Sequence, residues 1–314
     1  MITRPEVSVI IPTRDALQRL PAAIASIGPH PNLEILVVDD GSTDGTLAWL
    51  GELAVADHRV RFMHGSKTGP SRARNLAIGA ARSPLVAFLD ADDRWLPGKL
   101  DAQLALHRAH PEIGFSFTDY RHINTRNQNR GSCFAGWPRF AARFGTAIDS
   151  FVLDRAVATL YAENVVATST VMARTDLLQQ AGGFNTGLAS AEDWDMWLTL
   201  AGRAPVGVVP HILAEYAMYH PGNVTGRRDL RVMAMRVIAE RHRARALSED
   251  PAADTGFKAC IFAAQAEIAE ANGHRLRSVA LRIRALAYQP TRRGAYDLMG
   301  AIYQPNCRSP YGVG

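Results

Sequence analysis

The stretch Leu85-Val86-Ala87-Phe88-Leu89-Asp90-Ala91-Asp92-Asp93 runs from five apolar residues directly into three carboxylates. A short, unbroken apolar run is typical of a strand that is buried on both faces of a parallel sheet. The carboxylates would then lie at the C-terminal edge of that sheet, where open α/β folds bind ligands. Clustered carboxylates repel one another unless a cation neutralises them, and such oxygen-rich sites suit Mg²⁺ or Mn²⁺ together with phosphate groups. An acidic turn that caps a helix is the alternative interpretation of this stretch taken alone.

Strands and helices alternate around this stretch. Apolar runs predict buried strands at residues 7–12, 33–38, 60–63, 85–89, 114–117 and 165–173. Helical spacing of apolar residues predicts helices near residues 17–27, 70–80, 97–107, 175–181 and 191–200. This order indicates βαβ units, and therefore an α/β fold with a Rossmann-like, mostly parallel sheet flanked by helices.

Two segments depart from this pattern. Residues 119–164 are polar and irregular, which predicts a mobile loop that closes over the site when substrates are bound. From residue 229 onward the chain is rich in Ala and Arg and is predicted to be helical, with breaks at Pro251, Gly273 and Pro290. We therefore expect a catalytic α/β domain over residues 1–225 and a basic helical C-terminal extension over residues 226–314.

Charge is distributed unevenly along the 314 residues. Residues 226–314 hold fifteen Arg and Lys against eight Asp and Glu, whereas residues 1–225 hold twenty against twenty-two. A basic helical tail favours contact with an anionic surface, either membrane lipid or an acidic partner. For that contact, arginines such as Arg275, Arg277, Arg282 and Arg284 are expected to point outward. A homodimer interface and simple solubilisation of exposed helix faces are the alternatives.

Several features bear on the compartment. The sequence has no apolar run of the roughly 18 residues that a membrane span needs. Its start, Met1-Ile2-Thr3-Arg4-Pro5-Glu6, leads into a strand without the apolar region of a signal peptide. Three widely spaced cysteines indicate neither a disulfide framework nor a thiolate metal site. We expect a cytoplasmic protein, with peripheral contact at the inner face of the cell membrane as an open alternative.

Five motifs occur in a characteristic order: Val7-Ser8-Val9-Ile10-Ile11-Pro12-Thr13, Val37-Val38-Asp39-Asp40-Gly41-Ser42-Thr43-Asp44, Ala73-Arg74-Asn75, Phe88-Leu89-Asp90-Ala91-Asp92-Asp93 and Glu192-Asp193-Trp194. With these motifs the sequence resembles the family-two glycosyltransferases, inverting enzymes of the GT-A fold, over about residues 5–225. The resemblance implies a metal-dependent, non-processive transfer of one sugar. The donor would be a nucleotide-diphosphate sugar, most often of UDP with dTDP and GDP open, and the acceptor a glycan, a lipid-linked molecule or a small molecule.

The resemblance also implies a metal site. Asp92 would bind Mn²⁺ or Mg²⁺, while Asp90 and Asp93 would contact the ribose, the waters of the ion or the sugar. His220 would contact the metal or the diphosphate from a closing loop. Met218 stands where the family usually has an arginine, so an ordinary loop histidine is the alternative for His220.

The nucleoside would lie at the ends of the first two strands. The resemblance places Pro12 and Thr13 around the nucleoside, Asp40 against the base and Asp39 near the ribose or in the turn. Capping of the following helix is the alternative for the two aspartates, and Ser42 or Thr43 is also suited to that role.

One basic residue is expected to face the donor. By similarity this is Arg74, near the start of a helix, where a guanidinium and the helix N-terminus can converge on anionic groups. Asn75 would hold the local backbone, and Arg72 is equally well explained as a surface residue.

On the acceptor side, the resemblance identifies Asp193 as the general base that takes the proton from the attacking hydroxyl. One carboxylate suffices for an inverting transfer. Glu192 would orient the acceptor or the loop, and Asp195 would point elsewhere on the helix. Trp194 and Trp197 would either stack on a sugar or belong to the core.

Two other functions remain open. A sugar nucleotidyltransferase would need a glycine-rich basic loop after the first strand, where this chain has Pro12-Thr13-Arg14-Asp15. A non-catalytic module that binds nucleotide-sugars would have no need of a base such as Asp193.

Overall fold

The computed structural model describes residues 4–123, 129–217 and 228–303. Within these residues ten strands form one sheet, in the order β3-β2-β1-β4-β9-β6-β10-β5, with β7 beside β6 and β8 beside β10. The strands are β1 Val7–Thr13, β2 Leu33–Asp39, β3 Val60–His64, β4 Leu85–Phe88, β5 Arg94–Trp95, β6 Phe115–Ile123, β7 Asn129–Ser132, β8 Phe151–Val152, β9 Met172–Arg174 and β10 Val206–Ala217. The helices are α1 Leu20–Ser26, α2 Thr46–Ala56, α3 Pro70–Ala80, α4 Lys99–Ala109, α5 Pro138–Phe144, α6 Ala156–Ala162, α7 Thr175–Gln180, α8 Glu192–Ala201, α9 Arg228–Glu249, α10 Ala253–Ala271, α11 Arg275–Tyr288 and α12 Arg292–Tyr303, with 3₁₀ turns η1 Phe134–Gly136 and η2 Thr168–Thr170.

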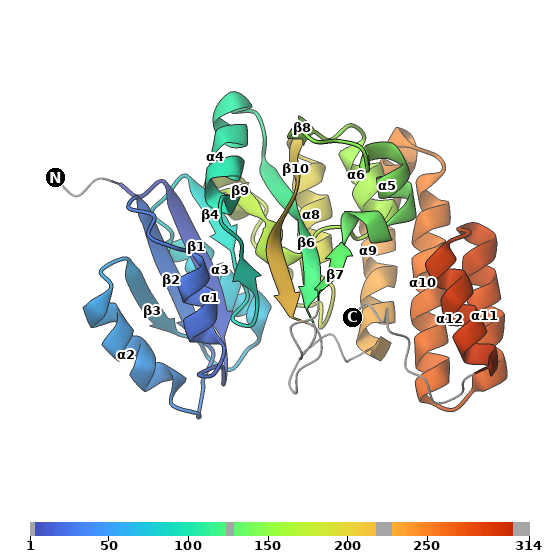
Figure 1. Ribbon diagram of the computed structural model, residues 1–314, viewed down its shortest axis with the longest axis horizontal. Coiled ribbons are helices and arrows are strands. Elements are labelled where there is room, and N and C mark those ends of the chain that lie inside the picture. Colours follow the sequence, from blue (N-terminus) through green and yellow to red (C-terminus); the bar gives the residue numbers. More distant parts are fainter. Residues whose placement is uncertain (1–3, 124–128, 218–227, 304–314) are drawn as a thin grey trace.

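Alternation along the central strands divides the core between the two faces of the sheet. In β1, for example, Ile10 packs on one face with α3 and α8, whereas Val9 and Ile11 pack on the other with α1 and α4. Because these strands are buried on both sides, they read as continuous apolar runs in the sequence. The sheet is thus sandwiched between helical layers, as Figure 1 shows.

Pairing of β1 with β2 and with β4 is parallel, and the register sets Thr13 opposite Asp39 and Ile10 opposite Phe88. The C-terminal ends of all three strands therefore meet at one edge of the sheet. The expected α/β fold with a mostly parallel sheet flanked by helices is confirmed. The exceptions are β9, which runs antiparallel to β4 and β6, and the short strands β5, β7 and β8.

Two local predictions were wrong. Residues 165–173 do not form one strand, because η2 interrupts them and only β9 pairs with the sheet. Residues 119–164 are not one irregular loop either. Within the described part of this segment, β6 continues to Ile123, and α5 and α6 follow with core side chains such as Phe140 and Tyr161. The buried aromatic residues of this segment are separated by many polar residues, so the sequence shows no regular helical or strand periodicity there.

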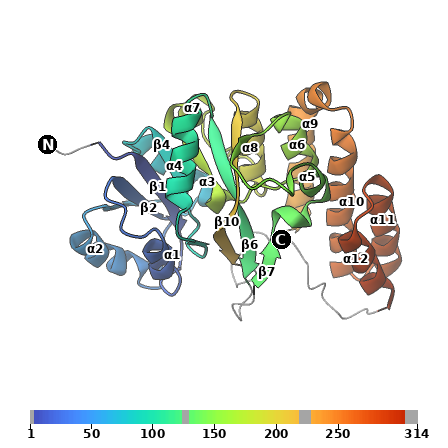
Figure 2. The same cartoon turned by 45° about the horizontal axis from the view of Figure 1, so that its top comes forward.

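The C-terminal helices form the other end of the molecule. Figures 1 and 2 place α10, α11 and α12 farthest from β1, β2 and β3, and α9 next to α6 and α8. Breaks between the helices fall at the predicted Pro251, Gly273 and Pro290. In α9, Met235 and Ile238 are buried in the same core cluster as α6 and α8. None of the helices in the described ranges combines the length and the apolar character that crossing a membrane requires.

Candidate active site

The ends of β1 and β2 form one wall of the candidate site. Thr13 ends β1 and is only 4% exposed, yet its Oγ1 has no hydrogen-bond partner among the described residues. Burying a hydroxyl without a partner costs free energy, so such a group points to a ligand atom or a water in the functional state. Pro12, just before it, is partly exposed at the same edge.

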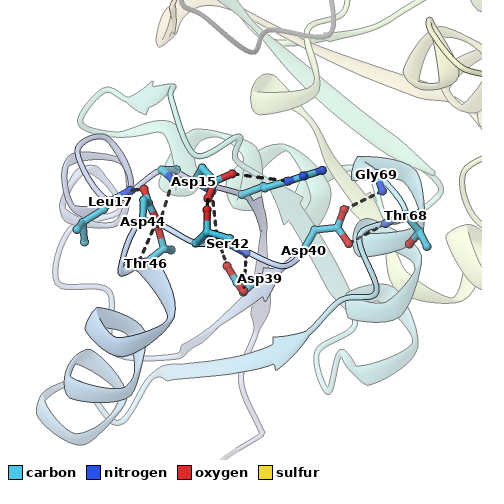
Figure 3. Close-up of polar contacts among 12 residues, drawn as sticks. Asp15, Leu17, Asp39, Asp40, Ser42, Asp44, Thr46, Thr68 and Gly69 are labelled. Atoms are coloured by element: carbon cyan, nitrogen blue, oxygen red, sulfur yellow. Dashed lines mark hydrogen bonds and ion pairs between the residues drawn. The ribbon is translucent and has the colours of Figure 1, made fainter.

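Asp39 and Asp40 have different tasks (Figure 3). Asp39 accepts hydrogen bonds from the backbone N–H of Ser42 (3.2 Å) and from its hydroxyl, and so closes the turn after β2. Asp40 accepts from the backbone N–H groups of Thr68 (3.0 Å) and Gly69 (2.8 Å), just before α3.

Neither aspartate caps the helix that follows it, and the N-cap residues of α2 and α3, Gly45 and Gly69, make no side-chain capping bond. Asp40 holds the start of α3 rather than the helix that follows it in sequence. At the start of α2, Asp44 accepts from the Thr46 N–H at 3.0 Å, so neither Ser42 nor Thr43 fills the capping position. Contact between Asp40 and a base stays a prediction.

The acidic stretch after β4 divides into three environments. Asp90 accepts from Nη2 of Arg74 at 2.7 Å, and its backbone N–H donates to the Ser169 hydroxyl at 3.0 Å. Asp92 is partly exposed. Asp93 is only 2% exposed and accepts from the Ser169 hydroxyl at 2.5 Å and from the Ala217 N–H at 2.9 Å.

These contacts give Asp93 a structural part in the loop, and its contact with the donor stays a prediction. Both of its oxygens are used to join the acidic loop to η2 and to the end of β10. Burial, followed by repulsion from Asp92 and Asp90, raises the pKa of Asp93 well above the usual range. We therefore assign Asp93 to the support of the loop.

Arg74 connects the acidic loop to the start of α8. It lies on α3, is almost completely buried, and donates from Nη2 to Asp90 and from Nη1 to Glu192 at 3.2 Å. Burial alone would lower the pKa of Arg74, but Asp90 and Glu192 outweigh it and raise the pKa. Among the described residues its Nε has no hydrogen-bond partner. Arg72 is exposed, as its surface alternative predicted.

Asn75 holds the backbone beside Arg74, as expected. Its side chain donates from Nδ2 to the Phe184 carbonyl at 2.9 Å and accepts from the Phe184 N–H at 2.7 Å. The Phe184 ring in turn lies under the Arg74 guanidinium, 5.3 Å from its Cζ. This fixes the position from which Arg74 reaches both carboxylates.

Glu192 and Asp193 open α8 directly after Ala191, a non-glycine residue with a left-handed φ of 54°. Asp193 accepts from the Trp194 N–H at 2.8 Å and from the Thr168 hydroxyl at 3.2 Å. Burial raises the pKa of Asp193, and Arg74, the Trp194 N–H and Thr168 offset part of that rise. Burial and the neighbouring Asp193 likewise raise the pKa of Glu192 against the opposing charge of Arg74.

The tryptophans of α8 belong to the core. Trp194 is buried, donates from Nε1 to the Leu160 carbonyl at 2.7 Å and packs against Phe257 of α10. Trp197 is fully buried against Phe88. The core interpretation is the one that these contacts fit, and Trp194 is not placed to stack on a sugar.

Two residues of the site were missed from the sequence. Thr168 and Ser169 lie in η2, where Thr168 touches Asp193 and Ser169 touches both Asp90 and Asp93. Their signal was a Thr-Ser-Thr run in a segment that we assigned to a strand because of its β-branched residues.

A metal held at Asp92 would need ligands beyond the carboxylates of the described residues. In the described ranges, which exclude His220, no three His, Cys, Asp or Glu side chains converge to hold an ion. Asp90 and Asp93 are engaged by Arg74 and Ser169. A single carboxylate from Asp92, completed by diphosphate oxygens and waters, still matches the way in which Mg²⁺ is usually held.

Comparison with known proteins agrees with this arrangement. Residues 8–161 match the model of glycosyl transferase family 2. An uncharacterized glycosyltransferase of Rickettsia felis is 32% identical over 212 residues, which is 67% of this chain and 32% of the relative. The chain belongs to glycosyltransferase family 2. It spans about a third of the length of that relative.

Solved structures share the fold of this family-2 chain. A crystal structure of S. aureus TarS with UDP-GlcNAc matches with a TM-score of 0.64 at 20% identity, covering 93% of this chain and 83% of the other. The mannosyltransferase PcManGT from Pyrobaculum calidifontis, with GDP-Man and Mn²⁺, matches with a TM-score of 0.59 at 22% identity, covering 97% and 82%. At these identities the likeness shows the fold, and the predicted GT-A type architecture is confirmed.

Proposed function

We propose that this family-2 protein is an inverting, metal-dependent glycosyltransferase that moves one sugar from a nucleotide-diphosphate sugar to an acceptor hydroxyl. The observation that carries the proposal is the bridge formed by Arg74. The Arg74 side chain pairs with Asp90, in the acidic loop on the proposed donor side, and with Glu192, next to Asp193 on the proposed acceptor side. One side chain therefore joins the two sides. Catalysis of transfer needs both sides in one place.

The nucleoside is proposed to lie at the ends of β1 and β2. There Thr13 has a buried hydroxyl with no partner among the residues that the structure describes, and Asp40 retains lone pairs for a donor group of the base. Neighbouring structures hold UDP-GlcNAc in one case and GDP-Man in the other, which supports a nucleotide-sugar donor and leaves UDP and GDP as the first bases to test.

A divalent ion held by Asp92 and the diphosphate would supply positive charge where the leaving group becomes negative. The presence of Mn²⁺ in the PcManGT structure supports this assignment. Asp90 belongs to the same acidic loop as Asp92, and its side chain is 26% exposed. It is therefore suited to contact the ribose or the sugar.

The transfer itself needs one proton acceptor. As the acceptor oxygen forms its bond to the anomeric carbon, the bond from that carbon to the diphosphate oxygen breaks, and the electron pair leaves with the nucleoside diphosphate. Asp193 takes the proton of the attacking hydroxyl. Attack opposite to the leaving group inverts the anomeric configuration, and no glycosyl-enzyme forms.

The domain division expected from the sequence is retained as part of the proposal. Residues 1–225 would carry the donor and acceptor sites, and residues 226–314 would support and locate them. A module that only binds nucleotide-sugars would not need a base, so the presence of Asp193, supported by Thr168, argues against this alternative.

Calorimetry with UDP, GDP and dTDP, each with and without Mn²⁺, tests the donor assignment. We expect one nucleotide to bind tightly, and only with metal. Asp92→Asn should abolish the effect of Mn²⁺, whereas Asp101→Asn, at an exposed position on α4, should leave it unchanged. Equal affinities for all three nucleotides in EDTA would contradict the metal assignment.

Product analysis tests the mechanism. Once a donor is known, the anomeric configuration of the transferred sugar should be opposite to that in the donor. Asp193→Asn should slow transfer by roughly 10² to 10⁴ while donor binding persists, and Glu192→Gln should do less harm. Retention of configuration would exclude a single-displacement reaction.

A further inference from the structure

The two last helices expose apolar side chains where helices normally bury them. On α11, Leu276, Ala280, Ile283 and Ala287 follow one another at helical spacing, and all four are exposed. Leu276 is 87% and Ile283 is 53% exposed. An amphipathic helix of a globular protein usually turns such a stripe toward the core. This stripe faces outward because α11 packs on α10 through its other side, where Ser278 is buried.

Helix α12 has the same character. Tyr296, Met299, Ile302 and Tyr303 are exposed, with Tyr303 at 71%. The two helices are joined by Arg275, whose Nε donates to the Ala301 carbonyl at 3.0 Å and whose Nη2 donates to the Ile302 carbonyl. This contact sets the end of α12 beside the start of α11. We refer to the exposed apolar residues of α11 and α12 as the tail surface.

Basic residues flank the tail surface. Residues 274–303 contain six arginines and a single acidic residue, Asp297. Arg277 follows Leu276, Arg284 follows Ile283, and both are exposed. The expectation that Arg282 also reaches outward was wrong, whereas Arg275 is exposed as expected. Arg275 binds the end of α12, and the Arg282 side chain is 11% exposed and paired with Glu270.

Charge decides which kind of partner fits. A symmetric dimer would bring the same surface of two copies together, and so would oppose two faces that each carry Arg277 and Arg284. An anionic partner relieves that charge instead. Large apolar side chains next to arginines are the combination that lies at a membrane interface, with the apolar groups at the acyl boundary and the guanidinium groups on the phosphates.

We propose that α11 and α12 form a docking surface for an anionic lipid bilayer. The surface binds through Leu276, Ile283 and the apolar residues of α12, and Arg277 and Arg284 select negative headgroups. Docking would set α11 and α12, at the end of the molecule opposite β1, β2 and β3, against the membrane. The proposal is independent of the sugar that the enzyme transfers.

Sedimentation with phosphatidylcholine vesicles, with and without phosphatidylglycerol, tests this surface. We expect the whole chain to sediment only with phosphatidylglycerol present and less at high salt. Arg277→Gln with Arg284→Gln should weaken binding by roughly 30-fold, because each near-surface arginine is worth about a fivefold change.

Leu276→Glu with Ile283→Glu should abolish sedimentation. The matched control is Val55→Glu, because Val55 is 88% exposed on α2 at the opposite end of the molecule, and it should bind as the wild type does. Thermal melts and nucleotide binding should be unchanged in all variants, which separates this test from that of the catalytic site.

Three results would overturn the proposal. One is sedimentation that is absent or equal for neutral and anionic vesicles. Another is a loss of binding in Val55→Glu as large as in the variants of α11. The third is a concentration-dependent dimer, measured by ultracentrifugation, that Leu276→Glu with Ile283→Glu dissociates, since the tail surface would then bind a second copy.

Discussion

The Thr168 hydroxyl lies 3.2 Å from Oδ2 of Asp193 and donates a hydrogen bond to it. The other carboxylate oxygen accepts from the backbone of Trp194. Asp193 is therefore held from two directions, by η2 and by the first turn of its own helix. This support fixes the direction from which an acceptor hydroxyl can approach the base, and it lowers the pKa of a carboxylate that burial raises.

Removing the Thr168 hydroxyl should weaken the base without unfolding the site. Thr168→Val keeps the shape of the side chain, and we expect the rate of transfer to fall roughly tenfold, as for loss of a hydrogen bond to a charged group. Thr168→Ser should retain most of the activity. The acidic limb of the pH profile should also move to higher pH in Thr168→Val, since the hydroxyl no longer stabilises the ionised form. A lower rate with an unmoved limb would mean that Thr168 acts only on packing.

The pH dependence of transfer should report Asp193 itself. Its pKa in the folded protein lies above the ordinary value because burial disfavours the charge. The protonated form cannot accept a proton, so the rate should fall as pH drops through this raised pKa, at a higher pH than for an exposed aspartate. Rates at saturating donor from acidic to neutral pH measure the limb.

The same raised pKa carries a consequence for stability. At a pH above this pKa, the folded protein must keep a negative charge that its surroundings disfavour. The melting temperature of Asp193→Asn at neutral pH should therefore be equal to or higher than that of the wild type. The difference should shrink at acidic pH, where the wild-type side chain is protonated. A marked loss of thermal stability in Asp193→Asn at neutral pH would contradict the raised pKa.

Arg74 should be far less tolerant of change. Replacing it with Met would leave Asp90 and Glu192 close together without their shared cation, and breaking a buried pair in this way costs about 3–5 kcal/mol. Arg74→Lys should recover only part of the loss, because an ammonium group cannot hold two carboxylates with the planar geometry of a guanidinium. Denaturant unfolding measures both variants, with exposed Arg72→Met as the matched control on the same helix. Equal stability of Arg74→Met and Arg72→Met would show that the bridge contributes nothing.

Local patterns and motifs predicted the edge of the sheet well, because each strand of that edge is a buried apolar run that ends in polar residues of the candidate site. Asp90, Arg74 and Asp193 each belong to a short motif, which is why the sequence offers them as site candidates, and their roles stay predictions. What the sequence could not show is the network between motifs. That Asp40 holds the start of α3 and that Asp93 ties η2 to β10 depend on contacts between distant parts of the chain. Thr168 and Ser169 belong to no recognisable motif. Their contacts with Asp193, Asp90 and Asp93 form only because the fold brings η2 next to the acidic loop and the start of α8.

Asp195, two residues after the proposed base, links α8 to the C-terminal helices. Its buried carboxylate accepts from Nη1 of Arg241 and lies 2.8 Å from Nε2 of His242, both on α9. Since α9 also buries Met235 and Ile238 in the common core, we expect α8 to depend on the C-terminal extension for its position.

Asp195→Asn should therefore lower the free energy of unfolding by about 2–4 kcal/mol, because a buried charge network loses its anionic centre. Amide exchange should speed up in both α8 and α9, and not in β1 or β2. Asp229→Asn, at an exposed position on α9, serves as the control and should leave exchange unchanged. If a chain that ends at residue 225 folds with the stability of the whole protein, the extension does not support the catalytic helix, and the dependence inferred from Asp195 is wrong.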